Sequence, residues 1–101
     1  MQRGSIDQTN TRWRALGHSL YWKRLEDHYV VYNSGSGHTH VLDPFAALLI
    51  QQLTEECCET SELLRRIGAL LNLKPTEELR SQLQQTLWQL DELGLVEPVI
   101  A

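Results

Sequence analysis

Two histidines, His38 and His40, stand two positions apart in a run of β-branched and apolar residues. If this run is a strand, alternate side chains point to one face, so both imidazole rings lie on the same side. Two imidazoles are part of a zinc site, but zinc takes three or four ligands. The other two histidines of the chain lie outside any ligand motif. The sequence therefore favours structural histidines and predicts no bound metal.

Nucleophilic and redox chemistry have equally little support. Ser36 lies between Gly35 and Gly37, but Gly35-Ser36 suits a type II′ hairpin turn, which needs glycine at its first central position. Cys57 and Cys58 are adjacent, a spacing that rarely satisfies disulfide geometry and that is no zinc knuckle without further ligands. The sequence has no glycine-rich phosphate loop, HExxH or GxSxG motif. It predicts a protein that is not an enzyme and has no cofactor.

Three extended segments surround the histidines, each rich in aromatic and β-branched residues. They span residues 20–25, 28–33 and 38–42. A tight hairpin between the second and third segments places Val31 opposite His40 and Val30 opposite Val41. Both faces of this predicted sheet are then substantially apolar, which is more than a sheet with one solvated side requires.

From Asp43 onward the apolar period changes from two residues to 3.6. Asp43-Pro44 predicts a helix start, with Asp as the N-cap and Pro in the first turn, and the helix spans 44–56. Thr60 is the predicted N-cap of a second helix, which residues 72–75 interrupt, and a third helix begins near Thr76. This order predicts an α+β fold that is winged helix-turn-helix-like, a three-stranded antiparallel sheet followed by three helices.

The chain has 101 residues, enough for one domain. We expect that domain at 13–101, after a polar tail over residues 1–12 that has no periodicity. No apolar run approaches the ~20 residues that span a bilayer, and the first residues lack the apolar stretch of a secretory signal. The sequence predicts a soluble, cytoplasmic protein without membrane contacts.

Helix-turn-helix domains often bind DNA, so a winged-helix transcription regulator is the main alternative function. The recognition helix would be the third, where Arg80 is the one basic residue among acidic side chains. These acids include Glu77 and Glu78 at the helix start, where a major-groove reader approaches the phosphates. We therefore expect no nucleic-acid partner.

Four runs of the sequence, in this order, resemble the PqqD family of small peptide chaperones, which act as peptide recognition elements. The runs are LYW at 20–22, VVYN at 30–33, SGHTHVL at 36–42 and LWQLDELGLVE at 87–97. The resemblance covers about residues 13–99. The VVYN and SGHTHVL runs look closest to the branch called the HPr-rel-A system, which is associated with an HPr-kinase-related protein.

The resemblance implies a non-catalytic winged helix-turn-helix domain that presents a precursor or leader peptide to a modifying enzyme of the same system. In the family, the peptide is added as a strand on the third strand and lies in the groove beside the third helix. The implied peptide-binding residues here are His38, Thr39, His40, Val41, Leu42, Leu83, Gln84, Leu87, Trp88 and Asp91.

Physical chemistry supports this mode of binding independently. An edge strand offers unpaired N–H and C=O groups, and a neighbouring helix supplies pockets for alternate side chains. The second edge of strand 38–42 is open unless residues 13–16 cover it. A further alternative is an accessory subunit whose edge strand completes a partner's sheet without any peptide substrate.

Overall fold

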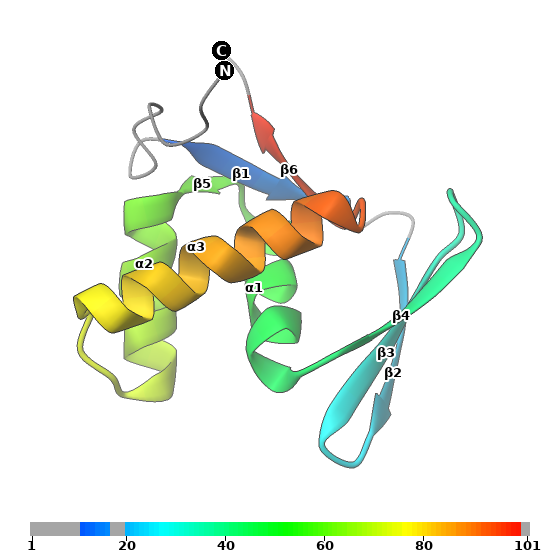
Figure 1. Cartoon of the computed structure of the whole chain (residues 1–101), viewed down its shortest axis with the longest axis horizontal. Coiled ribbons are helices and arrows are strands. Elements are labelled where there is room, and N and C mark those ends of the chain that lie inside the picture. The colour runs from blue at the N-terminus through cyan, green and yellow to red at the C-terminus, as the bar shows by residue number, and fades with distance from the viewer. Residues whose placement is uncertain (1–10, 17–19, 100–101) are drawn as a thin grey trace.

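The computed structural model describes residues 11–16 and 20–99. These residues form two three-stranded sheets and three helices (Figure 1). One sheet has the order β2-β3-β4 and the other the order β5-β1-β6. The predicted α+β fold, with a three-stranded antiparallel sheet followed by three helices, is confirmed.

The first sheet is an antiparallel meander of consecutive strands. It consists of β2 (Leu20–Leu25), β3 (His28–Asn33) and β4 (His38–Leu42). Val31 lies opposite His40 and Val30 opposite Val41, as the sequence predicts. Local propensity was sufficient here because aromatic and β-branched residues fill all three strands.

The turn between β3 and β4 differs from the predicted type II′ turn. Residues 34–37 form the loop, and the positive φ of +79° belongs to Gly37 rather than to Gly35. Gly37 donates its N–H to the carbonyl oxygen of Asn33 over 2.7 Å. The Asn33 side chain also accepts from the N–H of Gly35 at 2.9 Å. This Asx-type bond organises the loop, because an asparagine side chain can substitute for a backbone acceptor.

Helix α1 (Pro44–Glu55) begins where the sequence predicts and ends one residue earlier. Asp43 is its N-cap and accepts a hydrogen bond from the N–H of Ala46 at 2.8 Å. The helix is central: it contacts both other helices as well as β1, β3 and β4. Its buried side chains include Leu49 and Ile50, neither of which is exposed to solvent.

Helix α2 spans Thr60–Leu71, and the prediction of Thr60 as its N-cap is wrong. The N-cap is Glu59, which makes no side-chain capping bond. The buried Thr60 hydroxyl instead accepts from the indole N–H of Trp13 at 3.0 Å and donates to the carbonyl of Thr11 at 3.2 Å. The hydroxyl therefore bonds to residues distant in the sequence instead of capping the helix, because a buried polar group needs hydrogen-bond partners.

Helix α3 spans Glu77–Glu92 and is capped by Thr76, which accepts from the N–H of Leu79 at 3.2 Å. Gly94 follows the helix with φ +77°. The N–H of Leu95 then returns to the carbonyl of Leu90 at 2.9 Å. This is the reversal that glycine permits after a helix.

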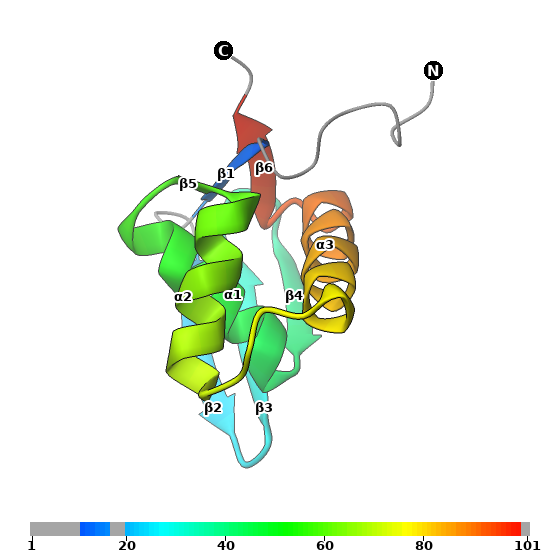
Figure 2. The ribbon, with the colours of Figure 1, turned by 90° about the vertical axis from the view of Figure 1, so that its left-hand side faces the viewer.

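The second sheet joins segments far apart in the sequence. Strand β1 (Arg12–Ala15) lies between β5 (Cys58–Glu59) and β6 (Val96–Val99). Of the tail expected over 1–12, residues 1–10 lie outside the described residues, whereas Arg12 already pairs with Glu59 and Val99. Figure 2 shows this sheet at one end of the molecule, with the β2–β3 hairpin at the other.

The described helices are all too short or too polar to cross a bilayer.

Candidate functional site

Strand β4 is an edge strand with one free side. Within residues 11–16 and 20–99, its one strand partner is β3. Strand β1, which the sequence placed as a possible cover, pairs with β5 and β6 instead. The free side of β4 therefore offers backbone groups to a further strand.

A hollow of about 190 Å³ lies between the end of β4 and helix α3. Figure 1 shows that the C-terminal part of α3 lies toward β4, whereas its N-terminal part lies beside α2. The hollow is lined by Val41, Leu42, Asp43, Ala46, Thr86, Gln89, Leu90 and Leu93. One charged side chain is among them, Asp43, whose carboxylate is engaged in capping α1. The floor is apolar, because Leu42 and Leu90 are both buried core residues.

The two outer strands of the first sheet differ in charge. Strand β2 carries Lys23 and Arg24, and neither forms an ion pair within the described residues. Strand β4 contains no Lys, Arg, Asp, Glu or Pro. Charged side chains protect an edge strand from pairing with other chains. The edge at β2 therefore has this protection, and the edge at β4 lacks it.

The predicted site residues on β4 alternate between two faces. Leu42 is buried and His40 half-buried on the face toward the helices, whereas Thr39 and Val41 are exposed on the opposite face. Because β4 is the edge strand, Val41 also borders the hollow. The rings of His38 and His40 meet edge to face, with centroids 6.3 Å apart. The structure thus places both imidazoles on one side of the strand, as the spacing predicts.

The predicted site residues on α3 fall into two groups, and neither lines the hollow. Leu83 and Leu87 are completely buried in the core. Gln84, Trp88 and Asp91 are half-buried. At 100° per residue these three lie on one flank of the buried stripe.

Besides the buried Leu90, the hollow is lined by Thr86 and Gln89 of α3 and by Leu93, the C-cap residue of this helix, which lie on the opposite flank. Sequence reasoning missed them because the apolar stripe of a helix does not tell which of its two polar flanks faces a neighbouring strand. No signal in the sequence marked Leu93 either: its spacing predicts a place in the buried stripe, and this prediction is wrong, because the side chain is 41% exposed.

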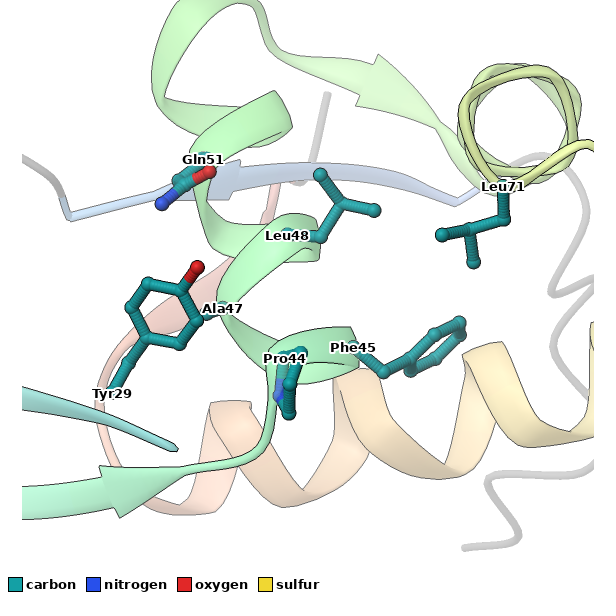
Figure 3. Close-up of a pocket in the computed structure, with 7 residues that line it drawn as sticks. All are labelled: Tyr29, Pro44, Phe45, Ala47, Leu48, Gln51 and Leu71. Atoms are coloured by element: carbon teal, nitrogen blue, oxygen red, sulfur yellow. The ribbon is translucent and has the colours of Figure 1, made fainter. Parts of the chain in front are cut away.

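A larger pocket, of about 410 Å³, lies elsewhere and was not predicted. Figure 3 shows Phe45 and Leu48 of α1 beside Leu71 of α2, with Tyr29 and Gln51 on the other side. It is lined by Tyr29, Pro44, Phe45, Ala47, Leu48, Gln51 and Leu71, with no residue of β4 or α3. Its lining has no charged or nucleophilic side chain, so it offers packing surface rather than chemistry.

The cysteines and histidines carry no evident reactive centre. Both cysteines are free, and burial raises the pKa of the Cys58 thiol, which keeps it protonated. On α2, Glu62 accepts hydrogen bonds from Arg65 and Arg66, which lower the pKa of its carboxyl group. Within the described part of the chain, no group of three or more His, Cys, Asp or Glu could hold a metal ion.

Comparison with known proteins identifies a shared fold. No family model matches the chain, and neither does any curated protein sequence. The fold is similar to that of a solved structure described as TbiB1 in complex with the TbiA(beta) leader peptide, with a TM-score of 0.65. The two sequences are 17% identical, and the likeness covers 87% of this chain and 99% of that one. At this identity the comparison establishes the fold.

Proposed function

We propose that this chain is a non-catalytic adaptor, which binds a precursor or leader peptide and presents it to a modifying enzyme. The peptide is added as an extra strand at the free edge of β4. The observation that carries this proposal is the uncharged free edge of β4 beside the hollow at α3.

Strand addition uses both parts of this arrangement. Backbone hydrogen bonds to β4 supply sequence-independent affinity, and a pocket that receives alternate side chains supplies specificity. In this chain the hollow would receive them against Ala46, Leu90 and Leu93. The edge at β2 is a poor alternative, because Lys23 and Arg24 would have to be accommodated beside an incoming strand.

Two similarities support a peptide as the ligand. The protein of similar fold, TbiB1, was solved in complex with a leader peptide. The sequence runs at 30–33 and 36–42 resemble those of PqqD-family peptide chaperones. By that resemblance, we propose an HPr-kinase-related protein of the same system as the partner enzyme.

The proposed contacts are residues 38–42 on β4, Thr86 and Gln89 on α3, and Leu93 at the C-cap of α3. Leu83 and Leu87 support this surface from the core. The other flank of α3, with Gln84, Trp88 and Asp91, remains the sequence prediction, and variants on the two flanks distinguish the two assignments.

The proposal is tested with peptides selected from a random display library on the immobilised whole chain. A selected peptide is synthesised and titrated into the isotope-labelled chain, and backbone amide shifts are followed by NMR. We expect the largest shifts in residues 38–42 and in α3 near Leu93. Silent amides in β4, while another surface responds, would show that strand addition at this edge is wrong.

A further inference from the structure

The first sheet has an outer face, and the proposed function uses it only at β4. In the register of the three strands, every second residue points away from the helices and its neighbours point toward them. We call this set the outer face, and it consists of Tyr21, Lys23, Leu25, His28, Val30, Tyr32, Thr39 and Val41. Its exposed side chains are unusually apolar: Tyr21 is 63% exposed, Leu25 47% and Val41 66%. The face contains no carboxylate.

An exposed face of this kind needs explanation, because antiparallel sheets that meet water on one side are usually polar there. Exposed apolar patches mark binding surfaces. The area helps to identify the occupant. Two strands of six residues and one of five, ~4.8 Å apart and rising ~3.3 Å per residue, cover roughly 250–300 Å². A stable dimer buries about 800 Å² per partner, so the face is too small to pair alone with a second copy.

Val41 connects this face to the free edge. Among the large apolar residues that the structure describes it is the most exposed, and it lies on the edge strand itself. A strand added beside β4 directs its side chains alternately toward the hollow and toward the outer face. The outward side chains would then lie about 5 Å, between Cβ atoms, from the side chains they face on β4.

We propose that the peptide recognised at β4 is apolar on both sides, with β-branched or aromatic residues facing outward as well as into the hollow. This inference rests on the proposed function and specifies the class of peptide. The outward residues pack on Val41 and extend the apolar outer face by one strand. Val30, directly opposite Val41 on β3, continues the same apolar row. An amphipathic strand with one polar side is excluded as the preferred ligand.

The first test is the pattern of residues in peptides selected from a random display library on the whole chain. The expected result is apolar residues at consecutive positions along the segment that shifts the amides of 38–42. Polar or charged residues at every second position of that segment would overturn the inference and leave the proposed function standing. Selected peptides that leave those amides unshifted would contradict the proposed function itself.

The second test is a double-mutant cycle between Val41→Thr and a peptide whose outward apolar residue is replaced by Thr. Threonine retains the β-branch and thus the strand propensity. We expect each change alone to weaken binding about two- to fivefold, as cross-strand pairs do, and the two together to weaken it by little more than one. If the two losses of affinity simply multiply in the double variant, the two side chains do not interact, and the inference is overturned.

The matched control is Tyr21→Thr, which removes a similarly exposed side chain from the same face, on β2, with β3 and β4 between it and the peptide. Its expected effect on peptide affinity is nil. A loss as large as that of Val41→Thr would show a general effect of the face and overturn the inference. Thermal melting of both variants shows whether the sheet remains folded, with a small loss of stability expected for Tyr21→Thr because its ring packs against that of Tyr32, centroid to centroid 6.4 Å.

Discussion

At the scale of single residues, contacts with other segments of the chain explain the roles of Thr60 and Gly68, which local sequence patterns do not reveal. Thr60 has the sequence context of an N-cap, but its hydroxyl bonds the indole of Trp13, 47 residues away in the chain. Gly68 had no distinguishing pattern at all, and the structure shows why glycine stands there. A Cβ at this position would lie 2.8 Å from the backbone oxygen of Leu73. Both facts depend on a distant or following segment, which a local pattern does not contain.

We expect Thr60→Val to lower the free energy of unfolding by about 1–3 kcal/mol, because it leaves the buried indole N–H of Trp13 without an acceptor. Thr60→Ser retains the hydroxyl and is the control, with a smaller loss. Urea denaturation measures both. A valine variant as stable as the serine variant would show that the hydrogen bond contributes nothing.

We expect Gly68→Ala to destabilise the chain by about 1–3 kcal/mol, although alanine is the better helix former. The added methyl group would meet the carbonyl oxygen of Leu73. Because this oxygen belongs to the backbone, it cannot move aside as the end of a flexible side chain can. The reciprocal substitution one position later, Ala69→Gly, controls for propensity and should cost about 1 kcal/mol. Thermal melting measures both, and a more stable Gly68→Ala variant would contradict the expected clash.

At the scale of elements, the sequence predicted the strands of the first sheet and the three helices, since each has a strong local period. It did not predict which segments pair at long range. No local pattern connects residues 12–15 with residues 96–99, which the structure pairs as β1 and β6. The orientation of α3 relative to β4 was likewise undetermined, because its stripe of Leu83, Leu87 and Leu90 fixes the buried side alone.

For α3 we expect Leu93→Ser to weaken the binding of a selected peptide by about 1–3 kcal/mol, because this leucine lines the hollow. Gln84→Ser, on the opposite flank, is the control and should leave the affinity unchanged. Isothermal titration calorimetry measures both. If Trp88→Ala weakens binding while Leu93→Ser does not, the peptide contacts belong to the flank that the sequence predicted.

At the scale of the whole molecule, charge separates the proposed function from DNA binding. The chain has 13 acidic residues against nine basic ones. Of the described basic residues, five form ion pairs, among them Arg80 with Glu77 at the start of α3. This leaves little positive charge to meet a phosphate backbone, which dominates the affinity of DNA-binding proteins.

We therefore expect no binding of duplex DNA at physiological salt. Fluorescence anisotropy with a labelled random-sequence duplex measures it, and the same titration at low salt detects a weak electrostatic component. A micromolar or tighter Kd with a steep dependence on salt would contradict the expectation and favour the transcription regulator.

The pairing of β1 with β6 has a consequence for how this domain can be joined to other polypeptides. Arg12 lies directly opposite Val99, so the chain enters and leaves the described domain at one place (Figure 1). Domains with adjacent entry and exit points can be inserted into a surface loop of a host protein without separating the strands. The β2–β3 hairpin projects from the opposite end (Figure 2), so such a graft would leave it facing away from the host.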